Sequence, residues 1–180
     1  QKGVMGGVAG LAILVAMNPQ NIFANTTGAT EQAEIAINEL NFPDAGFRQY
    51  ILDEIDVDKN QSLSETERFK TEMYVYQEDM WINDLTGLEY FEDLEKLHIH
   101  YYGGTELDLS EFTGLTTFSL AIAPELATLE LSGLDYDEIT LMYCLKLSDL
   151  QLEAPNLGEL LIMECNELKH LDLSGCGDGF

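Results

Sequence analysis

The sequence predicts an α/β solenoid, in which short parallel strands stack behind a small helical cap. Two observations lead to this expectation. From residue 94 onward, pairs of apolar residues separated by one position recur at a nearly constant spacing, and before them lies a helix–loop–helix pattern with a carboxylate-rich loop. The chain of 180 residues is 46% hydrophobic, which is enough to form the core of a domain.

The charge balance narrows the range of partners. Only 8 Lys and Arg residues oppose 33 Asp and Glu residues, so the formal net charge is −25. Such a chain repels nucleic acid and anionic membrane surfaces, whereas it suits divalent cations and basic partners. With 3 cysteines, a small and odd number, no disulfide framework is expected to organise the fold.

Residues 1–24 have the pattern of a secretory signal peptide. Lys2 precedes an apolar run over residues 3–17, and Ala24 offers a small residue for cleavage. The run is shorter than the roughly 20 apolar residues that span a bilayer, and a buried core helix is the alternative. We therefore expect a secreted or cell-surface protein without a membrane span in the mature chain. Residues 25–40 are predicted to be a linker or a short element, either a helix begun at Thr30 or a strand around residues 35–37.

Residues 41–80 are predicted to form the helical cap. Pro43 fits the first turn of a helix, where its missing N–H is not needed, and Asp44 adds a favourable negative charge there. Apolar residues follow at helical spacing and would form one buried face: Phe47, Tyr50, Ile51 and Ile55.

A candidate calcium loop follows this helix. Over residues 56–67, oxygen-bearing side chains stand at loop positions 1, 3, 5 and 9, and a Glu stands at position 12. Calcium takes roughly 6–8 oxygen ligands, which a tight loop can turn inward from alternate residues. The predicted ligands are Asp56, Asp58, Asn60, the backbone carbonyl of Ser62, Ser64 through water, and Glu67.

This loop resembles an EF-hand. It departs from that family at position 6, where Gln61 stands in place of Gly. Because this position needs positive φ, the departure adds strain of about 1 kcal/mol, and we expect a Ca²⁺ site with a dissociation constant of about 0.1–1 mM. A second interpretation needs no metal: Ser64 and Glu67 form a capping box for the next helix, and the loop is a solvated acidic turn between two capped helices.

Residues 81–180 contain an internal repeat. Its apolar pairs are Leu97/Ile99, Leu107/Leu109, Phe118/Leu120, Leu129/Leu131, Ile139/Leu141, Leu150/Leu152, Leu160/Ile162 and Leu171/Leu173. Every second pair begins at position 97, 118, 139 or 160, which is a constant step, and the intervening pairs begin at 107, 129, 150 and 171. Alternation within a pair makes a short strand with two inward side chains, and the regular step stacks successive strands about 4.8 Å apart.

An apolar residue also stands three positions before seven of the eight pairs, which gives the pattern L-x-x-L-x-L. This pattern resembles the short nested repeats of bacterial leucine-rich repeat proteins. Residues 85–94 (LTGLEYFEDL) and the preceding helix with its acidic loop resemble the first repeat and the N-terminal cap of internalin-like surface proteins. The resemblance covers residues 41–180 and implies a leucine-rich repeat solenoid. Because a solenoid needs a cap on its last coil, we expect truncation at the C-terminus.

The three cysteines fall into register with the repeat. Cys144, Cys165 and Cys176 each stand three positions after the second member of a pair. In the leucine-rich repeat family this position holds a small buried side chain, so the resemblance implies a structural role for them. Cys144 and Cys165 lie one period apart, and a disulfide between them would need favourable Cβ geometry.

The outward positions of the two strand series differ in charge. Those of the series beginning at 107 are rich in acids, whereas those of the series beginning at 97 carry no charge at neutral pH. The second set, called the uncharged face below, is the predicted partner-binding surface: His98, His100, Ser119, Ala121, Thr140, Met142, Leu161 and Met163. Exposed Leu and Met are unexpected on so acidic a chain and are typical of a binding patch, unless another coil, a second copy or a C-terminal part covers them.

These features predict an exported or cell-surface leucine-rich repeat module that binds an unidentified protein or peptide partner, in interaction or adhesion, with a weak calcium site in its cap. A structural spacer or stalk, whose function lies in a missing C-terminal region, is the alternative. We expect no enzyme, because the sequence contains no G-x-S-x-G elbow, no P-loop, no H-E-x-x-H motif and no paired catalytic carboxylates.

Overall fold

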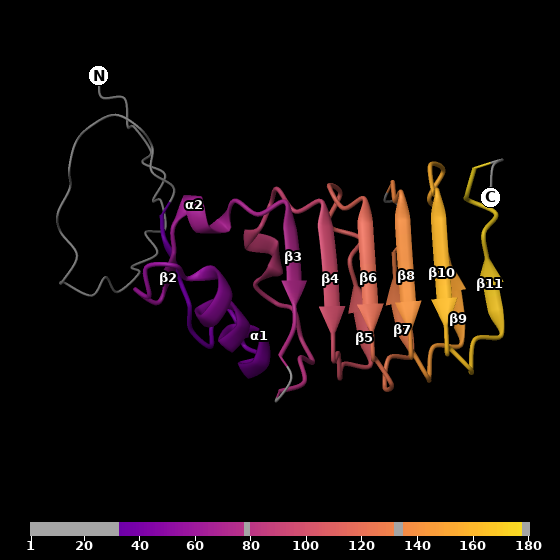
Figure 1. Cartoon of the computed structure of the whole chain (residues 1–180), viewed down its shortest axis with the longest axis horizontal. Coiled ribbons are helices and arrows are strands. Elements are labelled where there is room, and N and C mark those ends of the chain that lie inside the picture. Colours follow the sequence, from indigo (N-terminus) through magenta and orange to yellow (C-terminus); the bar gives the residue numbers. More distant parts are fainter. Residues whose placement is uncertain (1–32, 78–79, 132–134, 178–180) are drawn as a thin grey trace, which may run out of the picture. The chain divides into compact units, whose positions relative to one another are not determined.

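The structure, a computed structural model, describes residues 33–77, 80–131 and 135–177, which lie in one compact unit (Figure 1). The predicted signal peptide and residues 25–32 of the predicted linker lie outside the described residues. In chain order the elements are β1 (Ile35–Ala36), α1 (Ala45–Tyr50), η1 (Ile51–Ile55), β2 (Ser62–Leu63), α2 (Glu65–Arg68), β3 (Glu72–Val75), η2 (Leu88–Tyr90), β4 (Lys96–His100), β5 (Glu106–Asp108), β6 (Thr117–Ala121), β7 (Thr128–Glu130), β8 (Glu138–Met142), β9 (Asp149–Gln151), β10 (Glu159–Met163) and β11 (His170–Asp172).

The first helix buries the face that its sequence predicts. Asp44 is its N-cap, and the Asp44 carboxylate accepts a hydrogen bond of 2.8 Å from the Phe47 backbone N–H. Pro43 therefore lies before the cap rather than in the first turn, which corrects its expected position. The helix continues as the π-helical turn η1, and its predicted apolar face is buried: Phe47, Tyr50, Ile51 and Ile55.

A long-range pairing decides between the two alternatives for residues 35–37. Ile35 pairs with Leu63 in a two-stranded antiparallel sheet, and the Ile37 backbone N–H donates to the Gln61 carbonyl at 2.9 Å. The strand is therefore confirmed at Ile35–Ala36, and it anchors the N-terminal segment on the acidic loop.

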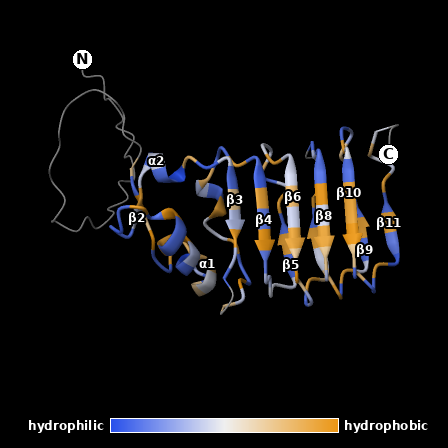
Figure 2. Ribbon diagram, in the orientation of Figure 1, coloured by the Kyte–Doolittle hydropathy of each residue, from blue (hydrophilic) through white to orange (hydrophobic). Residues whose placement is uncertain are grey.

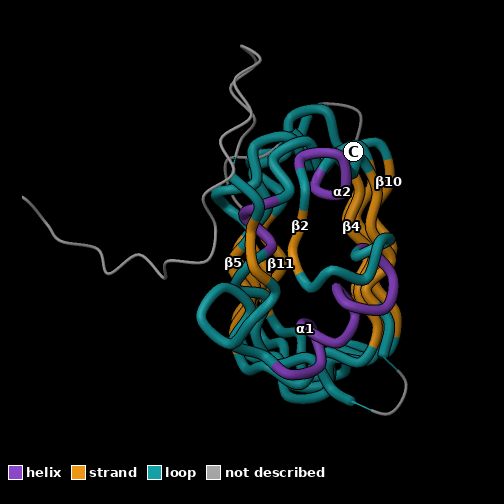
Figure 3. Tube along the Cα trace, turned by 90° about the vertical axis from the view of Figure 1, so that its left-hand side faces the viewer, coloured by secondary structure: helices purple, strands orange, loops and turns teal. Residues whose placement is uncertain are grey.

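The predicted repeat winds into a stack of short parallel strands. The larger sheet has the order β10-β8-β6-β4-β3 (Figure 1). Leu97 is in register with Phe118, Phe118 with Ile139 and Ile139 with Leu160, so residues one repeat apart lie side by side. On the other side of each coil, β5 pairs with β7 and β9 with β11, again in parallel. Figure 3 looks along the stack and shows the two groups of strands facing each other.

The core lies between these two groups of strands. Hydrophobic residues recur on successive strands (Figure 2), and the inward pairs from Leu97 to Leu152 are buried. Each such side chain contributes about 1.5–3 kcal/mol by leaving water, which is why the apolar period determines the register. Burial decreases at the last coil, where Leu160 and Ile162 are half-buried and Leu171 is exposed.

The parallel sheet begins one strand earlier than the repeat predicts. In β3, Met73 is in register with Leu97 and Val75 with Ile99, which are further apart in sequence than the paired residues of the later strands. The sheet thus extends into residues 41–80, which the sequence analysis assigned to the helical cap.

A strained corner follows each long strand from β4 to β10. Its residue adopts the left-handed conformation, with φ between 54° and 62°, although none is a glycine: Tyr101, Ile122, Tyr143 and Glu164. These positions again recur once in every repeat. The first three of these backbones join the next coil, as when the Tyr101 N–H donates to the Ala121 carbonyl at 3.1 Å, so the stacking maintains a conformation that costs about 1–2 kcal/mol.

Candidate functional site

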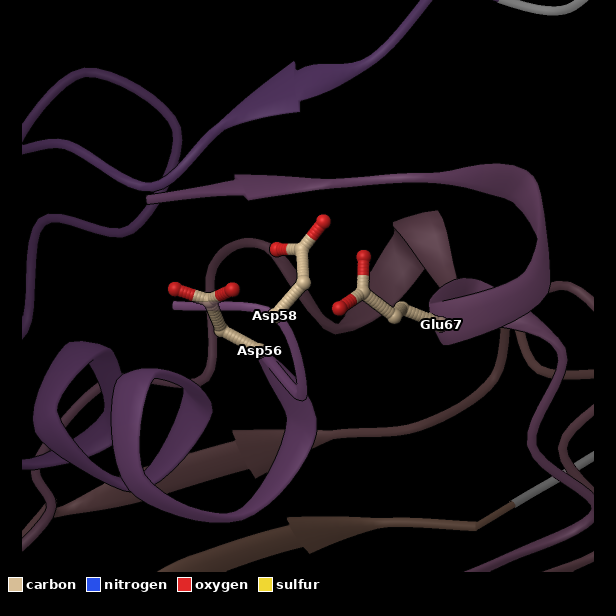
Figure 4. A group of neighbouring side chains, drawn as sticks. All are labelled: Asp56, Asp58 and Glu67. Carbon is tan, nitrogen blue, oxygen red and sulfur yellow. The ribbon is translucent and has the colours of Figure 1, made fainter. Parts of the chain in front are cut away.

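Three carboxylates of the acidic loop converge, as the calcium hypothesis requires. Asp56, Asp58 and Glu67 each place one oxygen within 4.8 Å of the others (Figure 4). Asp56 is buried at the end of η1, Asp58 is exposed in the loop, and Glu67 is supplied by α2. Figure 4 shows Asp58 between the other two side chains. Three like charges this close favour a bound cation.

Backbone hydrogen bonds hold the loop in shape. The Asp56 carboxylate accepts from the backbone N–H groups of Asn60 (3.2 Å) and Gln61 (3.0 Å). Gln61 has φ of 64°, so the positive φ predicted for loop position 6 is confirmed. Lys59 also has positive φ, and its Nζ donates to the carbonyls of Leu52 and Asp53.

The remaining predicted ligands lie on the loop but bond within the protein. The Asn60 side-chain oxygen accepts from the Ser62 backbone N–H and hydroxyl, both at 2.7 Å. The Ser62 hydroxyl also contacts Glu34 at 2.7 Å, an acid that the sequence analysis did not place near the loop. Its proximity results from the pairing of β1 with β2, for which the sequence offers no local indication.

The capping box of the metal-free interpretation is present. The Ser64 hydroxyl accepts from the Glu67 N–H at 3.3 Å, and Glu67 Oε2 accepts from the Ser64 N–H at 2.9 Å. The other Glu67 oxygen accepts from the Val57 N–H at 2.8 Å. Burial alone would raise the pKa of Glu67, but hydrogen bonds from Ser64, Val57 and Asp58 outweigh it and hold this pKa below its ordinary value.

The uncharged face lies along the larger sheet. Neighbouring strands align its members in two rows: His98, Ser119, Thr140 and Leu161 in one, and His100, Ala121, Met142 and Met163 in the other. Leu161 and Met163 are 39% and 45% exposed. Ala121 is only 3% exposed, because its short side chain stands between His100 and Met142 in the register. It adds little surface to the face.

Aromatic residues that the repeat does not predict extend this face toward the cap. Tyr74 of β3 is in register with His98, and the two rings stack at a centroid distance of 4.4 Å and an interplanar angle of 7°. Tyr76 contacts both His100 and Tyr101, with centroids 5.9 and 5.7 Å apart. Trp81 meets Tyr101 edge-on at 5.8 Å. The alternation of Met73 and Val75 with Tyr74 and Tyr76 is the sequence signal that could have found them.

The cysteines occupy the turns that the repeat predicts. Cys144 is buried, Cys165 and Cys176 are half-buried, and all three thiols are free. Cys144 and Cys165 follow strands that lie side by side, β8 and β10.

Comparisons with known proteins give matches only among solved structures. Neither the known family models nor the curated proteins include a match. Fifteen solved chains match, and one is the crystal structure of an internalin from Listeria monocytogenes, with 18% sequence identity and a TM-score of 0.40. That match covers 81% of this chain and 46% of the internalin, so the chain spans less than half of that protein. Within the described residues, no helix is long and apolar enough to cross a membrane.

The fold is that of a leucine-rich repeat solenoid. This conclusion rests on the parallel register between residues one repeat apart, together with the inward leucines of each L-x-x-L-x-L unit. The site that this solenoid presents is the pair of uncharged rows on the larger sheet, with aromatic residues at one end and exposed Leu and Met at the other. An in-register row that includes Lys96, Glu138 and Glu159 flanks them.

Proposed function

We propose that this chain is an exported or cell-surface module that binds a protein partner through the uncharged face. The observation that carries the proposal is the exposure of Leu161 and Met163 on a stripe without charges, in a chain of net charge −25. Exposed apolar side chains at one end of such a stripe, on an otherwise acidic chain, are typical of a surface that a protein partner covers. The repeating strands provide a rigid support, so little entropy is lost when a partner binds. We expect no catalytic activity.

Site-specific photo-crosslinking tests this proposal. A photoreactive phenylalanine replaces Leu161 in one variant and Gln151, on the opposite side of the coil, in the other. Each variant is incubated with proteins of the surrounding medium and of cell surfaces, and then irradiated. We expect one discrete adduct from position 161 and none from position 151, and mass spectrometry would then identify the partner.

The identified partner allows a quantitative control. Leu161→Ala with Met163→Ala should weaken its binding by about tenfold or more, whereas Thr128→Ala with Gln151→Ala should change it by less than about twofold. Unchanged binding in the first pair would contradict the proposal. It would favour the alternative, a spacer whose function resides elsewhere in a longer protein.

We also propose that the acidic loop binds Ca²⁺ weakly. The supporting observation is the convergence of the Asp56, Asp58 and Glu67 oxygens within 4.8 Å. When bound, calcium would offset two of these three negative charges and join η1 to α2, while Asn60, Ser62 and Ser64 stand at the other ligand positions of the loop. Carboxylate oxygens are the ligands that calcium prefers, so the three converging side chains support the proposal.

Thermal unfolding tests the calcium proposal. Millimolar CaCl₂ should raise the Tm of the chain by a few degrees over EDTA, because a ligand that binds only the folded state stabilises it. Asp56→Asn should abolish this increase, whereas Asp137→Asn, an exposed acid outside the loop, should preserve it. An equal Tm in EDTA and calcium would leave the capped acidic turn as the only role of the loop.

A further inference from the structure

A hollow with both aromatic and acidic walls adjoins the uncharged face. It has a volume of about 410 Å³ and lies where α1 and η1 approach β3. Its lining consists of Tyr50, Glu54, Ile55, Lys70, Glu72, Tyr74 and Tyr76. Neither the calcium loop nor the eight residues of the uncharged face take part in it.

Neighbouring groups hold the aromatic wall in place. One face of the Tyr74 ring is stacked on His98, and the Tyr74 hydroxyl donates to Glu72 Oε1 at 2.9 Å. Tyr74 nevertheless remains 60% exposed, and Tyr76, held edge-on against His100, remains 46% exposed. Rings fixed in this way offer a binding surface at small entropic cost.

Carboxylates and hydroxyls form the polar part of the hollow. Glu72 is partly exposed and lies 3.5 Å from the His98 Nε2 atom. Burial and the nearby Glu54 charge raise the pKa of Tyr50 to about 12, although a hydrogen bond from the Tyr74 backbone acts to lower this pKa. Tyr50 is therefore neutral at pH 7. The single cation of the lining is Lys70, opposed by two glutamates.

Aromatic rings combined with carboxylates are the groups that recognise an organic cation. A guanidinium suits them better than an ammonium, because its plane stacks on a ring while its N–H groups bond to carboxylates. The excess of 33 acidic over 8 basic residues in the whole chain adds a long-range attraction for a basic partner.

We propose that the hollow binds an arginine side chain of the protein partner, inserted between Tyr74 and Tyr76 and paired with Glu54 and Glu72. The inference rests on the proposed function, because the hollow lies at the cap end of the same sheet. It specifies the partner as one with an arginine-bearing basic segment at that end, while Leu161 and Met163 provide the apolar contact at the other.

The test uses the 180-residue chain and two short peptides in NMR titrations. One peptide is acetyl-Gly-Arg-Gly-Arg-Gly-amide; in the other, citrulline replaces arginine, which keeps the shape and removes the charge. About 150 mM NaCl reduces the general attraction of an acidic protein for any basic peptide. We expect the arginine peptide to bind at least about fivefold more tightly, with shifts centred on Tyr74 and Tyr76.

Paired variants separate the hollow from diffuse charge. The double variant Glu54→Gln with Glu72→Gln should bind the arginine peptide about tenfold more weakly. The control variant Glu111→Gln with Glu153→Gln, whose residues do not line the hollow, should change the affinity by less than about twofold. Lys70→Gln removes the competing cation and should tighten binding by about twofold or more. These are conservative surface changes, and an unchanged Tm confirms that each variant is folded.

Several results would overturn the inference. Equal losses of affinity in the two double variants would mean that diffuse charge, and not the hollow, attracts the arginine peptide. Equal affinity for the two peptides would mean that the hollow recognises a neutral ligand, such as a glycan stacking on the tyrosines. The variant Leu161→Ala with Met163→Ala should leave the arginine peptide unaffected. If that peptide fails to bind while the partner still crosslinks at position 161, the arginine site is wrong and the proposed function stands.

Discussion

Ser64 and Glu67 cap the second helix reciprocally: each backbone N–H donates to the side chain of the other residue, at 2.9 Å from Ser64 and 3.3 Å from Glu67. Glu67 also accepts from the Val57 N–H, so one carboxylate ties the end of η1 to the start of α2. The stability of the cap therefore depends on the charge of Glu67.

The first prediction concerns how low pH affects the contribution of Glu67 to stability. Because the folded-state pKa of Glu67 lies below its ordinary value of 4.5, its contribution to stability is complete above that value and is lost as the pH falls through the lowered folded pKa. In EDTA at pH 7, Glu67→Gln should lower Tm by about 2–4 °C, as expected for a capping group worth about 1 kcal/mol. The difference between the two proteins should diminish below pH 4.5. A difference that stays constant down to pH 2 would contradict this assignment.

The second prediction concerns strain in the loop. Gln61→Gly should raise stability by about 0.5 kcal/mol, because relief of the positive φ is partly offset by the greater entropy of glycine in the unfolded chain. Lys59→Gly is the matched control. It relieves a similar φ of 59° but removes the Nζ hydrogen bonds to Leu52 and Asp53, so it should bring no gain. Chemical unfolding measures both, and an equal loss of stability in both variants would contradict the expectation.

The third prediction concerns a buried hydroxyl in the stack. Tyr136 is fully buried, and its hydroxyl has no hydrogen-bond partner among the described residues. Tyr136→Phe should therefore stabilise the chain by about 1 kcal/mol and raise Tm by about 2–4 °C. Tyr102→Phe should do the opposite, because the Tyr102 hydroxyl donates to the Glu106 carbonyl at 2.6 Å. A lower Tm for Tyr136→Phe would show that its hydroxyl is in fact bonded.

The fourth prediction concerns the thiols. Burial, reinforced by the neighbouring Cys165, raises the pKa of Cys144 to about 12, so this thiol stays neutral at pH 8. Iodoacetamide should alkylate Cys144 at least about tenfold more slowly than the half-buried Cys165 and Cys176, as peptide mass spectrometry can measure. In urea the three rates should become similar. Alkylation of Cys144 first in the folded chain would refute its buried position.

The sequence predicts the repeating part of the fold in detail. Because two inward side chains per strand must meet those of the next coil, the spacing of Leu97, Phe118 and Ile139 determines which residues pair. The uncharged face follows directly from the same register. The pairing of Met73 in β3 with Leu97 in β4 spans a longer segment than one repeat, and so β3 was not recognised as part of the stack.

The candidate sites were predicted less completely, because they depend on long-range contacts. Local spacing alone identified Asp56, Asp58 and Glu67, since their loop is contiguous. Glu34 reaches Ser62 only through the pairing of distant strands. The aromatic wall similarly requires that Tyr74 lie beside His98, which is known only when β3 is placed in the sheet.

The left-handed corners are a further feature that local sequence preferences do not predict. Tyr101 and Ile122 adopt positive φ although neither residue favours it. Their conformation is imposed by hydrogen bonds to the following coil, so no local preference could have revealed it.

Nuclear Overhauser spectroscopy provides the most direct test of the account. If the coils stack as described, amide and α protons should give inter-strand cross-peaks between Leu97 and Phe118, between Phe118 and Ile139, and between Ile139 and Leu160. The strands on the opposite side of the coil should give them between Leu107 and Leu129. Cross-peaks limited to residues three or four apart, as in helices, would contradict the solenoid and with it the face and the hollow that it creates.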